Sequence, residues 1–280
     1  MTLSIAYLGP KGTFSEFAAA AYADSLGEQA SNLRAYITIA QAIKATEQGE
    51  ADCCVVPIEN SINGGVTLTL DTLWEIETLQ IQQAFTLPVQ QALISSAKSL
   101  SEIDAVYSHP QALSQCRDWL ASNLPNVQLI PTSSTAEPLP RLKENPRTGA
   151  IASRWGARVY DLSVVAHPIN DYADNHTRFW VLSKQHNLQG QHTSLALKLL
   201  SNEPGALLKP LQLFSALNLN MSRIESRPTK RLLGDYIFFI DIEAGSSDPI
   251  MKTALELLKI HTATYKNFGS YNLTQLEPPT

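Results

Sequence analysis

The sequence has 280 residues, a length typical of about two domains, and 44% of them are hydrophobic, enough to fill ordinary cores. Its formal net charge of −5 argues against broad binding to nucleic acids or anionic membranes. No apolar run is long enough to span a bilayer, and the N-terminal MTLSIAYLGP lacks the plan of a signal peptide. We therefore expect a cytoplasmic protein.

The cysteines and histidines indicate neither disulfides nor a metal site. Three sparse cysteines, Cys53, Cys54 and Cys116, do not form a disulfide framework. The adjacent pair lacks the spacing of zinc ligands, and the histidines form no HxxxH set. We expect buried apolar thiols and no bound metal.

Strand and helix patterns alternate through the first part of the chain. Strands are expected at 4–8, 53–57, 105–107, 127–130 and 150–152, and helices at 13–26, 66–76, 109–120, 134–142 and 154–159. This alternation is typical of an α/β domain built on a mostly parallel sheet.

A second domain is expected after the polar segment KQHNLQGQ at 184–191, which has no periodicity and is typical of a linker. Strands are expected at 193–200, 219–226, 235–242 and 261–271, and helices at 204–217 and 248–259. The order βαββαβ is that of a ferredoxin-like unit. This common scaffold assigns no function by itself.

Four segments match the capping box S/T-x-x-E/Q, and they begin at Thr13, Thr38, Ser108 and Ser134. The simplest interpretation is that each box only satisfies free N–H groups at a helix start, worth about 1 kcal/mol. Thr38 fits the box without other unusual features, which favours this interpretation. Alternatively, the other three helix starts converge on one cleft at the ends of parallel strands, where they would favour an anion.

Polar stretches favour the cleft. PIENSINGG (57–65) ends a strand with a polar triplet, and its Gly-Gly turn allows close approach of the backbone to a ligand. Gln111 and Gln115 would share a helix face near Ser108. A plain polar loop and a solvated glutamine pair are the alternatives at these two places.

Thr177 and Arg178 lie where the polar part of DNHTRFWVL (174–182) meets an apolar strand. The arginine is able to hold a carboxylate through two parallel hydrogen bonds, and the threonine supplies a hydroxyl donor. These features suggest a small, anionic, hydroxylated ligand. No Ser-His-Asp or Cys-His set, Walker loop or GxGxxG is evident, which disfavours a hydrolase or a nucleotide enzyme.

Several motifs occur in the order found in prephenate dehydratases. They are GPKGTFSEFAA (9–19), PIENSINGGV (57–66), SHPQALSQC (108–116), TSSTAE (132–137) and DNHTRF (174–179). PGALLKPL (204–211) and NLNMSRIESRP (218–228) resemble the ACT regulatory domain of that family. The resemblance covers nearly the whole chain. It implies a monofunctional enzyme, without a fused chorismate mutase, that converts prephenate to phenylpyruvate with loss of water and carbon dioxide and needs no cofactor.

The resemblance also implies the architecture. A catalytic domain at 1–184 would have two α/β lobes, like a periplasmic binding protein, with one lobe at 1–77 and 169–183 and the other at 78–168. A ferredoxin-like ACT domain would occupy 191–280. Because effector sites of ACT domains usually form between subunits, a homodimer or homotetramer is expected.

In the family, the threonine of the TRF motif is catalytic, so Thr177 would hydrogen-bond the departing ring hydroxyl and stabilise charge on it. Arg178 would hold a substrate carboxylate. The other catalytic positions implied are Glu59, Asn60, Ser108 and Gln115. The substrate-binding positions implied are Ser61, Thr13, Ser134, Thr135 and Phe179.

The resemblance further implies that L-phenylalanine is an allosteric inhibitor that favours a closed, less active arrangement. The positions implied for its binding are Gly205, Ala206, Leu207, Asn220, Glu225, Ser226, Arg227 and Pro228. A helix start opened by Gly205 suits the effector's carboxylate, and Glu225 would pair with its ammonium group.

Two departures from the family pattern bear on the substrate. Gln91 stands where the family often has a histidine, and Pro140, together with Pro138, should distort the helix at 134–142 beyond its first turn. Arogenate dehydratase remains an alternative, because the motifs do not separate the two substrates. A non-catalytic amino acid sensor is a second alternative, which the full set of motifs around Thr177 disfavours.

Overall fold

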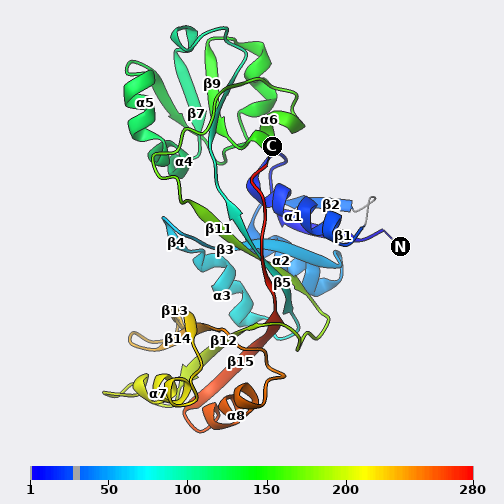
Figure 1. Ribbon diagram of the computed structural model, residues 1–280, viewed down its shortest axis with the longest axis vertical. Helices are drawn as coiled ribbons and strands as arrows, with labels where there is room; N and C mark the ends of the chain where they lie inside the picture. The colour runs from blue at the N-terminus through cyan, green and yellow to red at the C-terminus, as the bar shows by residue number, and fades with distance from the viewer. Residues whose placement is uncertain (1, 28–31, 280) are drawn as a thin grey trace.

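The computed structural model describes residues 2–27 and 32–279, and its three sheets follow one another along the long axis of the molecule (Figure 1). The fold is a mixed α/β fold with two lobes and a C-terminal domain. Within the described part of the chain, no helix is both long and apolar enough to cross a membrane.

The larger lobe is built on a sheet of order β16-β5-β11-β3-β1-β2, to which β4 adds by pairing with β3. Its strands are β1 (Ser4–Leu8), β2 (Asn32–Tyr36), β3 (Cys53–Asn60), β4 (Gly64–Gly65), β5 (Gln80–Pro88), β11 (His176–Ser183) and β16 (Leu273–Gln275). Its helices are α1 (Phe14–Ser25), α2 (Ile39–Gln48) and α3 (Thr67–Glu75).

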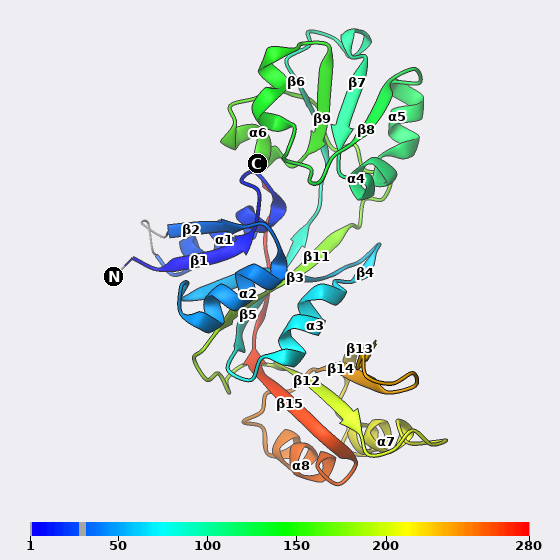
Figure 2. The same ribbon diagram turned by 180° about the vertical axis from the view of Figure 1, so that it is seen from behind.

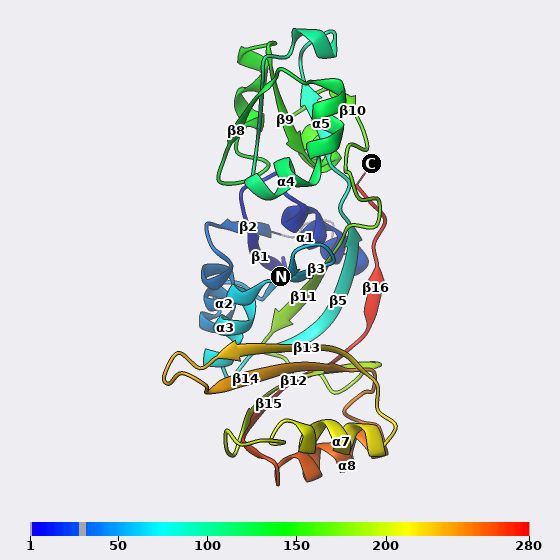
Figure 3. The same ribbon diagram turned by 90° about the vertical axis from the view of Figure 1, so that its left-hand side faces the viewer.

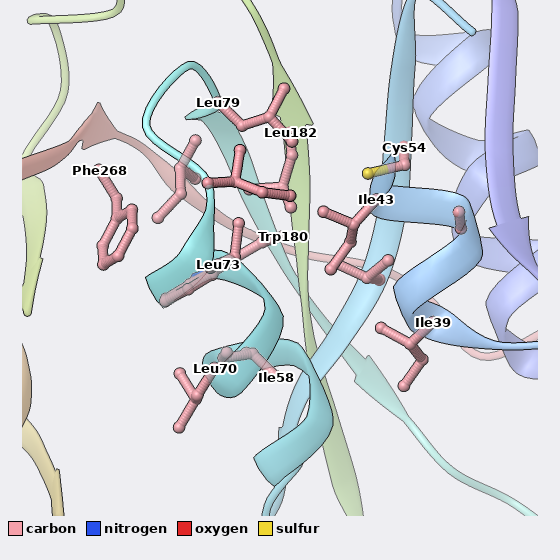
Figure 4. Packing of buried hydrophobic residues seen from close by; sticks show 14 of the residues in the cluster. Ile39, Ile43, Cys54, Ile58, Leu70, Leu73, Leu79, Trp180, Leu182 and Phe268 are labelled. Atoms are coloured by element: carbon pink, nitrogen blue, oxygen red, sulfur yellow. The ribbon is translucent and has the colours of Figure 1, made fainter. Parts of the chain in front are cut away.

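Both faces of this sheet are covered, which explains why its central strands are apolar runs. Phe179 of β11 packs on the α1 side. Trp180, the next residue, packs on the opposite side with Leu70 and Leu73 of α3 (Figure 4). Successive residues of β11 therefore serve two different cores.

The smaller lobe has a sheet of order β10-β6-β9-β7-β8. Its strands are β6 (Ala92–Ser95), β7 (Ala105–Ser108), β8 (Gln128–Pro131), β9 (Thr148–Ala152) and β10 (Val164–Ala166). Its helices are α4 (Pro110–Gln115), α5 (Arg117–Asn123) and α6 (Arg154–Val159), with short 3-10 helices η1 (Leu100–Glu102) and η2 (Leu139–Glu144). Figure 2 shows this lobe from behind, joined to the larger one by the segments next to β5 and β11.

The C-terminal domain has the expected order βαββαβ. Its elements are β12 (His192–Leu199), α7 (Leu208–Ala216), β13 (Met221–Pro228), β14 (Tyr236–Ile242), α8 (Pro249–Leu258) and β15 (Thr262–Tyr271), with sheet order β13-β14-β12-β15. Both helices lie on the face of this sheet turned away from the larger lobe (Figure 3). Phe239 and Phe268 on the other face join the core formed by α2 and α3.

Two lobe assignments made from the sequence are wrong. The division at 77/78 would place β5 in the smaller lobe, but β5 pairs with β11 along its length, so the chain crosses only after Pro88. The segment 273–275, assigned to the C-terminal domain, pairs with β5 as β16 of the larger sheet.

Two helices also differ from expectation. The helix expected at 134–142 is replaced by bends and then by η2, since proline at 138 and 140 removes N–H donors that an α-helix needs. The helix expected at 109–120 is divided at Cys116 into α4 and α5.

Candidate active site

Thr177 and Asn60 are cross-strand partners at the end of β3 and the start of β11. The Nδ2 of Asn60 lies 3.0 Å from the Thr177 hydroxyl oxygen. Asn60 Oδ1 accepts the backbone N–H groups of Ile62 and Asn63, at 3.2 and 3.1 Å, and this fixes the orientation of the amide. The Thr177 hydroxyl must therefore accept from Asn60, which leaves its own hydrogen free for another acceptor.

A chain of side-chain amides extends from this pair to the smaller lobe. Asn60 Nδ2 also donates to Asn175 Oδ1 at 2.7 Å, and Asn175 Nδ2 donates to Gln115 Oε1 at 3.1 Å. Gln115 and Gln111 both donate to Asn63 Oδ1, at 2.9 and 2.8 Å. Because each amide fixes the orientation of the next, the network holds α4 of the smaller lobe against the strands that carry Asn60 and Thr177.

The sequence did not single out two of these amides. Asn63 lies within PIENSINGG, and Asn175 stands two residues before Thr177. Asn175 lies one residue before β11 begins at His176, so the alternation of the strand does not reach it. Asn63 lies in a turn, where no such period exists.

A cavity of about 770 Å³ lies between the two lobes. Thr13 and the segment after β1 line it from the larger lobe, and His109 and Ser134 line it from the smaller one. These segments follow parallel strands, where ligands of α/β sheets bind. The segments at 13, 108 and 134 therefore meet at one cavity, as predicted, but no helix begins at 134, and Ser108 itself is buried outside the lining.

The helix starts at Thr38 and Thr13 are formed by different arrangements. Thr38 forms the full capping box. Thr13 accepts the N–H of Glu16, but the Glu16 carboxylate binds the N–H of Gly12 and, across the cleft, the indole N–H of Trp155 at 2.8 Å. Burial and this carboxylate raise the pKa of the adjacent Tyr7 hydroxyl. Glu16 therefore links the two lobes instead of completing a cap.

The capping box predicted at Ser108 is not formed. Ser108 is fully buried and donates to the carbonyl of Ile151 at 2.6 Å, while His109 caps α4 through Nδ1. Ser61 also acts on the backbone, since it donates to the carbonyl of Asp174 at 3.1 Å and accepts the N–H of His176. Both serines hold the site's framework.

Arg178 lies on the opposite face of the sheet from Thr177, because neighbouring residues of a strand alternate. Its guanidinium pairs with Glu59 at 3.0 Å and with Asp241 of the C-terminal domain at 3.3 Å. In this arrangement Arg178 and Glu59 bind each other and the C-terminal domain, so their expected roles toward the substrate stay predictions. Phe179, expected to bind substrate, is buried in the α1 core.

Four of the residues expected to bind the effector lie on β13, and they are divided between its two faces. Glu225 and Arg227 point toward the larger lobe, where Arg227 pairs with Asp71 at 2.9 Å. This placement disagrees with a role of Glu225 in holding an ammonium group in an open site. Ser226 and Pro228 alternate to the exposed face, and Gly205, at a φ of 84°, precedes α7, which begins without a side-chain cap.

The fold and the cleft together define a two-lobed α/β enzyme with an appended ferredoxin-like domain. The model of the family "Prephenate dehydratase" matches residues 5–187. The prephenate dehydratases of Lactococcus lactis subsp. cremoris and Bacillus subtilis are each 36% identical to this chain. Both alignments cover 98% of this chain, and they cover 99% of the Lactococcus protein and 100% of the Bacillus protein. This chain belongs to the prephenate dehydratase family, and it is a lyase of that activity.

A solved structure gives the same result for the whole chain. The prephenate dehydratase of Arthrobacter aurescens in complex with L-Phe is 34% identical, with a TM-score of 0.88 over 96% of this chain and 90% of that one. The similarity therefore includes the C-terminal domain as well as the two lobes.

Proposed function

We propose that the Thr177 hydroxyl is the hydrogen-bond donor to the leaving hydroxyl of prephenate in the decarboxylative dehydration to phenylpyruvate. The orientation of the Asn60 amide carries this proposal, because it makes the Thr177 oxygen an acceptor and directs the hydrogen elsewhere. A donor fixed before the reaction needs no reorganisation when charge develops on the leaving oxygen.

The reaction is balanced without an oxidant or a second substrate. The ring carboxylate leaves as carbon dioxide, and its bonding electrons enter the ring. The carbon–oxygen bond to the ring hydroxyl breaks at the same time, and this oxygen takes up a proton and leaves as water. The aromatic ring of the product supplies the driving force, so the protein's task is to place the substrate and stabilise the leaving oxygen.

The walls of the cleft fit the rest of the substrate. Thr13 at the start of α1 brings the N-terminal end of a 12-residue helix to the cavity, where a carboxylate is favoured. Ser134 and Thr135 belong to the segment on the opposite side, and Ser134 lines the same cavity. Gln115 and Asn175 join the donor pair to α4 of the smaller lobe.

We also propose that the C-terminal domain is an ACT domain that binds L-phenylalanine and inhibits the enzyme. The similar protein of Arthrobacter aurescens was solved in complex with L-Phe. The uncapped start of α7, next to Gly205, Ala206 and Leu207, supplies free N–H groups suited to the effector's carboxylate. A homodimer or homotetramer in which a second subunit completes this site, and a cytoplasmic location, remain predictions from the sequence.

The test is a parallel assay of purified protein with prephenate and with arogenate, measuring phenylpyruvate and phenylalanine. Phenylpyruvate from prephenate is expected. Faster formation of phenylalanine from arogenate would instead establish arogenate as the preferred substrate, and a lack of product from both would contradict the lyase activity. Initial rates are then compared with and without millimolar phenylalanine, and equal rates would contradict inhibition.

A further inference from the structure

Two neighbouring cross-strand pairs lie on opposite faces of the larger sheet, at the end that carries Thr177. Thr177 pairs with Asn60 across β11 and β3, and the next residues, Arg178 and Glu59, form the adjacent cross-strand pair. A register shift follows immediately, and it places Glu59 on the same face as Arg178. Any displacement of the ion pair therefore displaces the donor pair on the other face.

The second face meets a cluster of charges from the C-terminal domain. Asp241 of β14 accepts from Arg178 at 3.3 Å and from Arg223 of β13 at 2.7 and 3.2 Å. Arg223 also lies 3.8 Å from Glu59 and 3.3 Å from Glu225. We name these five residues the interdomain charge cluster. It joins the strands that carry the donor pair to the strands of the proposed regulatory domain.

The cluster is buried enough to be rigid. The Asp241 side chain is 0% exposed, and that of Arg223 is 8% exposed. Ser194 donates to Asp241 at 2.6 Å, and the Arg223 guanidinium lies over the Trp180 ring. Burial by itself would lower the pKa of Arg223, but the charge of Asp241 raises it overall. Separating such a pair leaves an uncompensated buried charge, so the cluster moves as a unit.

A second contact joins the same elements. The Glu225 carboxylate lies directly against Gly65, where an added Cβ would come within 2.0 Å of Oε2. Gly65 in β4 is paired with Glu59 in β3, next to the pairing of Gly64 with Asn60. The ESRP strand β13 therefore touches both sides of the strand end that carries Asn60.

We propose that Arg223 and Asp241 are positioning residues: through Arg178 and Glu59 they couple the effector state of the C-terminal domain to the placement of Asn60 and Thr177. This rests on the proposed inhibition by phenylalanine. Movement of β13 upon effector binding shifts the cluster, and the cluster shifts the strand ends that hold the donor pair. The β3–β11 ladder keeps these strands together when the cluster is weakened, so turnover without effector persists.

The test is Arg223→Gln in the full-length protein, with Lys266→Gln as the matched control. Lys266 crosses the same interface, with a side chain 10% exposed, but it binds the carbonyls of Trp74 and Ile76 and the carboxylate of Glu77, away from the catalytic strands. Phenylalanine binding is measured by calorimetry, with and without the product phenylpyruvate, and inhibition is measured from initial rates.

Coupling between two sites typically amounts to about 5–150-fold in affinity and is reciprocal. We expect the Arg223→Gln variant still to bind phenylalanine. Its coupling factor should fall toward one, so phenylpyruvate should change the affinity for phenylalanine little in calorimetry, and phenylalanine should change the initial rate little. Lys266→Gln should have the same coupling factor as the unaltered enzyme. Arg223→Lys keeps the positive charge but lacks the planar guanidinium with its paired N–H donors, so its coupling factor should be intermediate.

Each other outcome contradicts the inference in a distinguishable way. Unchanged coupling in Arg223→Gln, or equal loss in Lys266→Gln, overturns the role of the cluster alone. Binding of phenylalanine without inhibition of the unaltered enzyme overturns the coupling but keeps the effector site. Absence of binding to the unaltered enzyme overturns both this inference and the proposed effector site.

Discussion

Replacing Thr177 by valine tests the donor directly. Valine keeps the branched shape and removes only the hydroxyl, so Asn60 Nδ2 loses one acceptor but retains Asn175 Oδ1 and the carbonyl of His176, at 2.7 and 3.1 Å. The expected stability cost is that of one hydrogen bond, about 1 kcal/mol. Loss of a donor to a developing oxyanion costs more, about 10²–10³-fold in kcat or about 2.7–4 kcal/mol.

Two different measurements separate the cost in stability from the cost in catalysis. Urea unfolding should show the small change in stability, and phenylpyruvate formation at saturating prephenate should show the large fall in kcat with little change in KM. Thr177→Ser is the control, because it keeps the hydroxyl and should retain most of the turnover. A valine variant with nearly full kcat would refute the argument from the amide orientation.

Three further predictions concern stability and reactivity. Gly65→Ala should destabilise the protein by about 0.5–1.5 kcal/mol in urea unfolding, because its Cβ forces the flexible end of the Glu225 side chain away from its preferred rotamer, and adding Glu225→Ala should recover part of this loss; additive losses would contradict the clash. Burial raises the pKa of all three cysteine thiols to about 12, so iodoacetamide at pH 8 should modify them only in denaturant. A hydrogen bond from Arg227 lowers the pKa of Asp71 below its ordinary 3.8, so its stabilising effect is complete above that pH and lost below it. Asp71→Asn should therefore lower stability at pH 7 and the difference should shrink below about pH 4, whereas a pH-independent difference would count against the ion pair.

The sequence predicted most of the elements because their patterns are local. Periodicity and turn residues alone predicted the helix at 66–76 and the βαββαβ order of the last ninety residues. Pro140 was correctly expected to disturb its helix. The motifs around Thr177, Asn60 and Gln115 were likewise identified within short segments, and the structure joins these three through Asn175.

The partners of Arg178 could not be predicted, since they depend on contacts between residues far apart in the chain. Asp241 lies 63 positions further along, and nothing near it signals a contact with β11. The register shift between β3 and β11 beside Arg178 decides on which face of the sheet Glu59 lies, because a shift of one residue moves a side chain to the opposite face. The same limit applies to β16, whose three residues have no periodicity to indicate the sheet they join.

The path of β16 has a practical consequence. After completing the C-terminal domain, the chain continues through Asn272 and adds a parallel strand beside β5, with Leu276 packed against the α1 core. A fragment cut at the linker would therefore lack a strand of its own catalytic sheet and would expose β5 as an unprotected edge, a surface prone to self-association. The linker between the domains is thus not a place at which the chain can be cut without loss. A recombinant catalytic fragment would need residues 272–279, supplied as a separate peptide or by a permuted chain.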